Sequence, residues 1–257
     1  MSVIFSCITL QTIFTSIKEI IDILGKKSVL GVLNNMFTKG VVDIHQKLEE
    51  KYKPRLETKH PAIILLHGYG SNSSDLFSFA KYLPSNHTVI SLQAPMENPF
   101  GGYAWYSIQF NPDKNKWSDL DEARKSLNMI TKQLEYLKEE YNLDSNEISL
   151  MGFSQGAILS WSLLLDQPKK FRRAICMSGY INVELLKKPL ETYENIIAYG
   201  SHGKSDATVP FDWAESSIRT LQENNPNVVF NSYPDGHNVS QENFRDILEW
   251  FSKTNLD

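Results

Sequence analysis

A serine enclosed by two glycines is the feature of this sequence that points most directly to chemistry. Residues 152–156 read G-F-S-Q-G, so a glycine lies two positions before Ser154 and another two positions after it. A G-x-S-x-G motif between a strand and a helix is typical of a nucleophile elbow, a tight turn that exposes the serine hydroxyl and leaves no room for neighbouring side chains. The alternative is a chance match. The apolar runs at 148–151 and 157–165 favour the elbow, and we predict that Ser154 is a nucleophile.

A serine hydroxyl needs a histidine that accepts its proton, and the chain has six histidines. His237 directly follows the last expected strand, which is where the chain order serine, acid, histidine places the base. His67 is expected to brace its own loop, and the role of His202, at the end of a strand, stays open. Three histidines precede the elbow and are interpreted as surface or edge residues: His45, His60 and His87.

A carboxylate must then hold the imidazole in the correct tautomer. Three aspartates are candidates. Asp206 occupies the loop after an expected strand, Asp212 lies at the start of a helix where a negative charge is favourable in any case, and Asp235 is so near His237 that it is interpreted as a turn residue. We predict that Asp206 is the acid.

The tetrahedral intermediate of acyl transfer also needs fixed donors for its oxyanion. One donor in an elbow is the backbone N–H of the residue after the nucleophile, here Gln155. The second should come from the loop after the first core strand, where glycines flank Tyr69. We therefore predict an oxyanion hole made by the backbone of Tyr69 and Gln155, although the loop could be an ordinary turn.

The elements that must position these residues alternate between strand and helix. Apolar runs predict strands at 62–66, 87–92, 148–151, 173–177, 195–199 and 228–232, and helical spacing predicts helices at 75–83, 119–141, 157–165, 211–222 and 241–251. This alternation predicts an α/β fold with a mainly parallel sheet and helices on both faces. The segment 94–115 is rich in aromatic residues and is too long for a simple connector, so we expect a binding loop there.

The domain organisation follows from the absence of internal repeats and flexible linkers. We expect one catalytic domain over 47–257, with a short edge strand at 47–56, and an N-terminal extension over 1–46 that is helical or poorly ordered. The uncharged residues 1–17 imitate the apolar part of a signal peptide but lack its basic start, so a cytoplasmic location is expected. A translation start at Met36 stays open.

Composition excludes several classes of protein. The 257 residues carry 26 Lys and Arg against 30 Asp and Glu, a net charge of −4, with no basic block, so nucleic-acid binding is not expected. No run approaches the ~18 apolar residues of a membrane-spanning helix, so no stable membrane insertion is expected. Cys7 and Cys176 form neither a disulfide framework nor a zinc pattern, and no metal or cofactor is expected.

Four stretches together resemble the carboxylesterase/phospholipase family of α/β-hydrolases, which includes acyl-protein thioesterases: 65–70 (L-L-H-G-Y-G), 152–157 (G-F-S-Q-G-A), 205–210 (S-D-A-T-V-P) and 235–237 (D-G-H). The resemblance spans about 48–254 and implies an α/β-hydrolase fold. It also implies a triad of Ser154, Asp206 and His237, an oxyanion hole at Tyr69 and Gln155, and an acyl pocket lined by Trp105 and its aromatic neighbours. The short segment 179–194 predicts no large lid.

Two departures from the family pattern bear on function. Tyr69 stands where thioesterase members commonly have leucine, which leaves the acyl-chain preference open, and residues 1–46 have no counterpart. The prediction is a metal-independent serine hydrolase that cleaves carboxylic esters of small to medium acyl groups through an acyl-enzyme. The alternatives are a lysophospholipase or acyl-protein thioesterase and, from another class, a non-catalytic ligand-binding relative. Whether the chain forms a homodimer is open.

Overall fold

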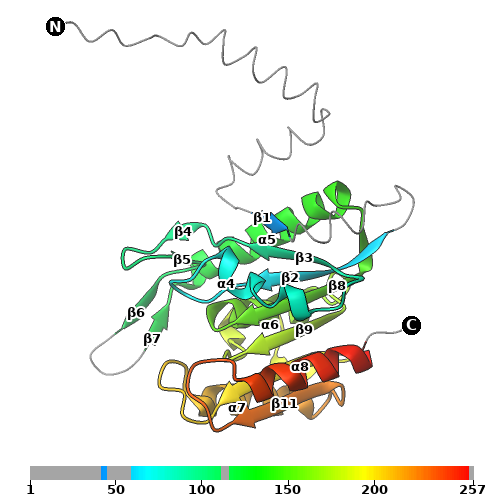
Figure 1. Cartoon of the computed structure of the whole chain (residues 1–257). Coiled ribbons are helices and arrows are strands. Elements are labelled where there is room, and N and C mark those ends of the chain that lie inside the picture. Colours follow the sequence, from blue (N-terminus) through cyan, green and yellow to red (C-terminus); the bar gives the residue numbers. More distant parts are fainter. Residues whose placement is uncertain (1–41, 45–58, 111–115, 255–257) are drawn as a thin grey trace, which may run out of the picture. The chain divides into compact units, whose positions relative to one another are not determined.

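The central element is a seven-stranded sheet in a computed structural model that describes residues 42–44, 59–110 and 116–254 (Figure 1). The strands follow the order β1-β3-β2-β8-β9-β10-β11. Neighbours from β3 to β11 run parallel, and β1 pairs with β3 antiparallel. The bounds are β1 Val42–Ile44, β2 His60–Leu66, β3 Thr88–Leu92, β8 Leu143–Phe153, β9 Arg173–Met177, β10 Ala198–Gly203 and β11 Val228–Tyr233. The mainly parallel sheet is confirmed.

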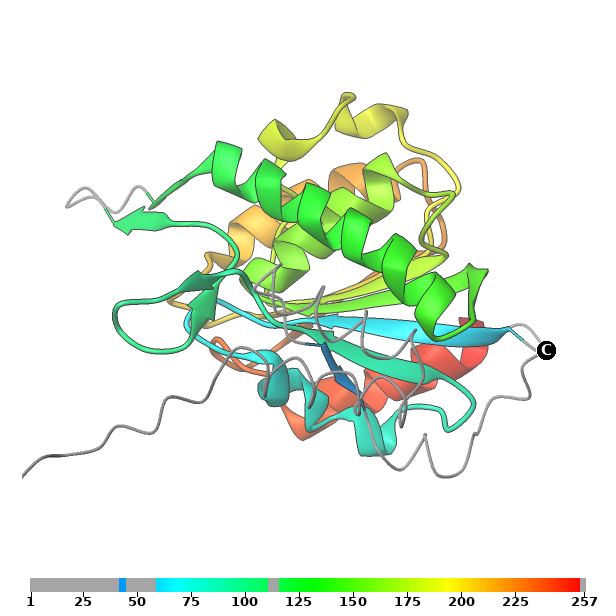
Figure 2. The same ribbon diagram turned by 90° about the horizontal axis from the view of Figure 1, so that it is seen from above.

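Helices cover both faces of this sheet, as the alternation predicts. Figure 2 shows α5 (Leu120–Glu140), α6 (Gln155–Asp166) and α7 (Phe211–Gln222) on one face, with α8 (Gln241–Thr254) and α4 (Ser73–Phe77) on the other. Alternate side chains of β2 enter two separate hydrophobic cores, one on each face of the sheet. Ile64 packs in one core and Ile63 in the other. This two-sided burial explains why the strand reads as a continuous apolar run.

Two hairpins and three short 3-10 helices complete the described part. The strands β4 (Met96–Glu97) and β5 (Tyr103–Ala104) pair, as do β6 (Ile108–Phe110) and β7 (Lys116–Ser118), and both hairpins project at one end of the sheet (Figure 1). They occupy most of the segment expected to be a binding loop. The 3-10 helix η1 (Ala80–Tyr82) follows α4. Between β9 and β10 lie only η2 (Val183–Leu185) and η3 (Leu190–Thr192), so the segment between these two strands contains no large lid.

Several boundaries differ from the sequence prediction. The strand predicted at 148–151 extends over Leu143–Phe153, and the helix predicted at 75–83 is divided into α4 and η1. β10 begins at Ala198 and not at residue 195, because Asn195 has a φ of 59°, outside the extended region, and the side chain of Asn225 accepts the Ile196 N–H at 2.9 Å. Residues 42–44 form β1 of the sheet although they fall in the expected extension. The remainder of that extension and the strand expected at 47–56 lie outside the described residues.

The described ranges contain no helix with the length and apolar character needed to cross a membrane. Among the same residues, no group of three or more His, Cys, Asp and Glu side chains is arranged to hold a metal ion. Cys176 is a free thiol in β9, and burial raises its pKa well above the ordinary value. Cys7 lies outside the described residues.

Candidate active site

Ser154 lies in a sharp turn between the end of β8 and the start of α6. Its φ of 54° and ψ of −117° place the backbone in a strained conformation, and its N–H donates to the carbonyl of Met177 at 2.8 Å. A Cβ on Gly152 would lie 2.4 Å from the carbonyl oxygen of Gly156, and a Cβ on Gly156 would lie 2.0 Å from that of Leu66. Both motif glycines are therefore sterically required, as a nucleophile elbow demands.

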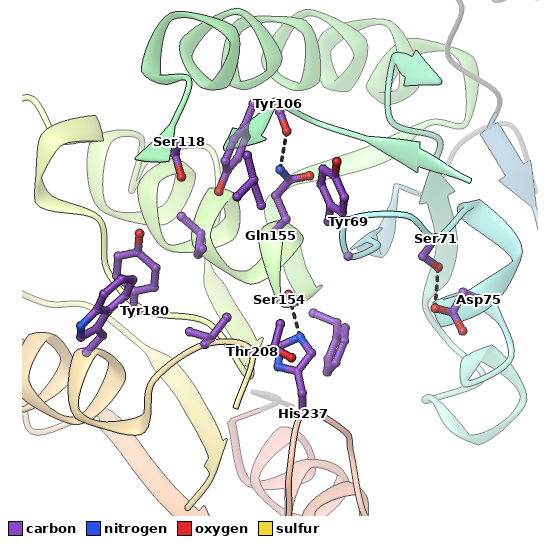
Figure 3. A pocket seen from close by; sticks show the side chains of 16 residues that line it. Tyr69, Ser71, Asp75, Tyr106, Ser118, Ser154, Gln155, Tyr180, Thr208 and His237 are labelled. Carbon is purple, nitrogen blue, oxygen red and sulfur yellow. Dashed lines mark hydrogen bonds between the residues drawn. The ribbon is translucent and has the colours of Figure 1, made fainter. Parts of the chain in front are cut away.

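The three side chains predicted to act on an acyl substrate meet in one hydrogen-bonded chain, of which Figure 3 shows the bond between Ser154 and His237. His237 Nε2 lies 2.9 Å from Ser154 Oγ, and His237 Nδ1 lies 2.6 Å from Asp206 Oδ2. An ionised carboxylate only accepts hydrogen bonds, so Nδ1 carries the hydrogen and Nε2 is free to accept the serine proton. Ser154 follows β8, Asp206 follows β10 and His237 follows β11, all at the carboxyl ends of parallel strands.

The surroundings of Asp206 keep its carboxylate ionised. Its Oδ1 accepts the backbone N–H groups of Thr208 and Val209, each at 2.8 Å. Burial raises the pKa of Asp206, but the hydrogen bonds from His202, His237 and Val209 outweigh it and hold this pKa well below the ordinary value. Within the described part of the chain, neither Asp212 nor Asp235 bonds to His237.

The two residues expected to form an oxyanion hole both line the cavity at Ser154. Gln155 is the first residue of α6, so its backbone N–H is one of the donors that a helix leaves without an intrahelical partner. Tyr69 lies in the loop after β2, beside Gly68, where an added Cβ would come 3.3 Å from Ser154 Cβ. The loop and the elbow are therefore in close contact.

The segment 103–106, here called the strap, connects the Tyr69 loop to Gln155. The Trp105 N–H donates to Gln155 Oε1 at 2.8 Å, and Gln155 Nε2 donates to the carbonyl of Tyr106 at 2.7 Å. The Gln155 side chain is 1% exposed, so both bonds are shielded from water. At its other end the strap joins the Tyr69 loop, because the Gly70 N–H donates to the carbonyl of Tyr103 at 2.8 Å. One segment thus ties down both expected donors.

The structure corrects the expectation for Trp105. This side chain is 2% exposed and is absent from the lining of the cavity described here. Its indole Nε1 donates to the carbonyl of His67 at 2.9 Å, which turns the ring inward. The expected brace by His67 within its own loop is observed, since its Nδ1 lies 2.8 Å from the carbonyl oxygen of Gly68; its Nε2 also accepts the Ala94 N–H at 3.1 Å, and burial lowers its pKa. Tyr106 and Ile108 line the cavity in place of Trp105.

The cavity at Ser154 has a volume of about 340 Å³ and a mainly apolar wall. Tyr180 and Trp213 make an edge-to-face pair with ring centroids 5.3 Å apart. Figure 3 shows the side chains of Tyr106, Ser118 and Tyr180 on one side of Ser154 and those of Ser71 and Asp75 on the other. The apolar residues of the wall are Ile108, Phe153, Ile158, Val209 and Trp213.

Sequence reasoning did not assign three features of this site. The Gln155 side chain, and not only its backbone, is structural; Tyr180 and Trp213 form a wall; and His202 contacts Asp206. No local pattern marked them, because the contact of His202 depends on how the chain turns after β10 and the other two depend on contacts between distant segments.

Comparison with known proteins places the chain in a family. A family model described as "Phospholipase/Carboxylesterase" matches residues 50–255, most of the chain. The chain belongs to the phospholipase/carboxylesterase family. Acyl-protein thioesterase 1 of Candida albicans is 24% identical over 209 residues, which cover 74% of this chain and 90% of that protein. A probable carboxylesterase, SOBER1-like, of Arabidopsis thaliana is 27% identical over 114 residues, 43% of this chain and 44% of that protein.

Solved structures show the same fold. The carboxylesterase of Bacillus cereus superposes with a TM-score of 0.69 at 20% identity, covering 87% of this chain and 98% of that one. Acyl-protein thioesterase 2 of Zea mays superposes with a TM-score of 0.61 at 21% identity, covering 83% and 98%. The α/β-hydrolase fold is confirmed, and this member of the phospholipase/carboxylesterase family is a hydrolytic enzyme that cleaves esters.

Proposed function

We propose that Ser154, His237 and Asp206 are the catalytic triad of this hydrolase, which cleaves carboxylic esters of small to medium acyl groups through an acyl-enzyme. The observation that carries the proposal is the unbroken chain of hydrogen bonds from Ser154 Oγ to Asp206 Oδ2, beside a mainly apolar cavity that Ser154 and His237 line. No metal or cofactor takes part.

The acylation step begins when Ser154 Oγ attacks the carbonyl carbon of the ester and His237 Nε2 accepts the hydroxyl proton. The carbonyl oxygen becomes an oxyanion, and the backbone N–H groups of Tyr69 and Gln155 stabilise its charge. Asp206 stabilises the imidazolium through Nδ1–H. When the intermediate collapses, His237 returns the proton to the leaving oxygen, which departs as an alcohol and leaves an acyl group on Ser154.

The deacylation step repeats this chemistry with water. His237 accepts a proton from a water molecule as that water attacks the acyl carbon, and a second oxyanion forms. Collapse breaks the bond to Ser154 Oγ, which takes the proton back from His237. The carboxylic acid leaves, and the enzyme returns to its starting state.

The cavity supports the proposed range of acyl groups. Its volume of about 340 Å³ is near the lower end of the roughly 300–1,000 Å³ of small-molecule sites, and its wall is mainly apolar. Thioester cleavage is the second candidate, because the similar protein of Candida albicans is named an acyl-protein thioesterase and the triad chemistry differs only in the leaving atom. A lysophospholipase is a third candidate, and a non-catalytic relative would have no need of this triad geometry.

The test is turnover of p-nitrophenyl esters of graded chain length, each beside the corresponding thioester. Ser154→Ala should lower kcat by at least about 10³ because the nucleophile is lost. Ser162→Ala is the matched control, since that hydroxyl lies on α6, donates to the carbonyl of Ile158 and does not line the cavity, and it should keep wild-type turnover. Addition of EDTA should change nothing. Unchanged turnover in the Ser154→Ala protein would refute the proposed function.

A further inference from the structure

A second histidine contacts the acid of the proposed triad. His202 is the fifth residue of the six-residue strand β10 and is fully buried. Its Nε2 lies 3.2 Å from Asp206 Oδ2 and 2.9 Å from the carbonyl oxygen of Val209. Asp206 Oδ2 therefore has an imidazole nitrogen on two sides, from His237 and from His202.

The neighbours of His202 Nε2 fix the position of its hydrogen. A backbone carbonyl can only accept a hydrogen bond, and the carboxylate of Asp206 is ionised and can also only accept. Nε2 must therefore carry a hydrogen, which it shares between the two oxygens. Within the described part of the chain, His202 Nδ1 has no hydrogen-bond partner, so no competing contact turns the ring away.

His202 and Val209 together enclose the carboxylate of Asp206. Val209 donates its N–H to Asp206 Oδ1 at 2.8 Å and accepts from His202 through its carbonyl. The ring of His202 packs edge-to-face against Phe211 with centroids 6.1 Å apart, a contact that restricts rotation of the ring. The loop from Asp206 to Val209 is thereby fixed at both ends by one side chain from the sheet.

We propose that His202 is a positioning residue: its Nε2–H holds the Asp206 carboxylate in the orientation that orders His237. The inference rests on the proposed function of Asp206 and goes one step further, to what holds the acid itself. His202 contacts neither the cavity nor Ser154 in the described structure, so it acts through Asp206.

The contact also has an electrostatic consequence. Both side chains that lie within 3.2 Å of Asp206 Oδ2 among the described residues are histidines, and the N–H of each partly neutralises the negative charge of that oxygen. With the His202 donor removed, more of that charge acts on His237 and favours its protonated form. The pH at which kcat/KM falls to half its plateau should therefore move upward, while a purely structural role would leave this midpoint in place.

The experiment compares His202→Phe with His202→Gln in pH profiles of kcat/KM for a short p-nitrophenyl ester. The Phe variant keeps a ring but has no donor, and we expect a fall in plateau kcat of about 10-fold to 10²-fold because Asp206 is less well placed, with KM within about threefold. Its acidic midpoint should rise by roughly half a pH unit or more. The Gln variant, whose amide nitrogen can reach the place of Nε2, should restore both quantities.

Control variants show whether the effect is specific to the contact between His202 and Asp206. His87→Phe replaces another buried histidine, far from Asp206 in the hydrogen-bond network, and should leave the profile unchanged. If His202→Phe does not fold, His202→Asn carries the test, because its shorter amide cannot reach Asp206: equal kinetics of the Asn and Gln variants would overturn the inference. A folded Phe variant with the wild-type midpoint and kcat would also overturn it. Turnover by Ser154→Ala would instead refute the proposed function.

Discussion

The two sides of Ser154 are built by different means. On the acid–base side, Asp206, His237 and His202 interact through their side chains. On the oxyanion side, the expected donors are backbone N–H groups of Tyr69 and Gln155, and the strap holds both of their segments through backbone atoms and the Gln155 side chain. Residue type is therefore decisive on the first side, and placement of the main chain on the second.

This difference determines how mutations should act. A substitution on the acid–base side changes the group that carries the proton or the charge, so it should alter both rate and pH dependence. A substitution on the oxyanion side leaves every N–H in the chain and can only displace it. Such a change should lower kcat without moving the pH profile.

The largest effect is expected on the acid–base side. Asp206→Asn should lower kcat by about 10⁴, because an amide can donate to Nδ1 and so stabilises the tautomer whose Nε2 cannot accept the serine proton. Steady-state turnover of a p-nitrophenyl ester measures this fall in kcat. Asp235→Asn is the matched control two residues from His237 and should cost less than about tenfold. A larger loss in Asp235→Asn than in Asp206→Asn would mean that the acid is wrongly assigned.

A smaller effect is expected on the oxyanion side. Gln155→Met keeps the length of the side chain but removes both bonds to the strap, and a displaced donor should lower kcat by about 10-fold to 10²-fold. The acidic midpoint of kcat/KM should not move, which is the point of contrast with His202→Phe. Kinetics between pH 5 and 9 measure both quantities.

A matched control exists for this glutamine. Gln222→Met makes the same chemical change at a residue whose Nε2 donates to the carbonyl of Val228, outside the site, and it should keep kcat within about twofold. Equal kinetics of the two Met variants would show that the strap does not position the donor. A shifted midpoint in Gln155→Met would show that the two sides are not independent.

The smallest kinetic effect is expected at His87, which belongs to neither side and which is buried, contrary to its interpretation from the sequence as a surface or edge residue. Burial, and then the charge of Arg173, lower the pKa of His87 from 6.5 to about 4. The unfolded chain therefore binds a proton more readily, so this contribution to stability is complete above about pH 6.5 and is lost as the pH falls toward 4. His87→Phe removes that dependence.

The free energy of unfolding measured in urea at pH 7.5 and pH 5 tests this point. Wild type should lose about 2 kcal/mol more over that interval than His87→Phe does. The kcat at pH 7.5 should be unchanged, because the ring of His87 packs against Phe251 and its Nδ1 bonds to Asn86. Equal losses of unfolding free energy in wild type and His87→Phe would contradict the lowered pKa of His87.

The sequence was most informative where a residue type is itself the requirement. The glycines around Ser154 are required by backbone contacts of 2.0 to 2.4 Å for an added Cβ, so the elbow could be predicted from their spacing together with the apolar runs on either side. Helix α7 has the predicted bounds, Phe211–Gln222, because its apolar residues recur at helical spacing. Asp206 and His237 could be proposed from their places after strands, although only the structure shows the distances between them.

The sequence was least informative where orientation decides. Trp105 and Tyr106 are adjacent aromatic residues, and nothing in their types shows that the first donates its indole N–H to His67 while the second lines the cavity. The end of β10 was also missed, because the strand continues through the polar residues Ser201 and His202, which pair with β11. Such pairing is a long-range property that local hydropathy does not record.

The loops that carry the acid and the base are joined through their main chains. The Ser205 N–H donates to the carbonyl of Asp235 at 2.9 Å, and a Cβ on Gly203 would lie only 2.2 Å from the carbonyl oxygen of Gly236. The separation of Asp206 and His237 is therefore already set when the chain folds. Little freedom remains to be lost at the transition state, so the activation entropy of acylation should be small and the temperature dependence of the rate should come mainly from activation enthalpy.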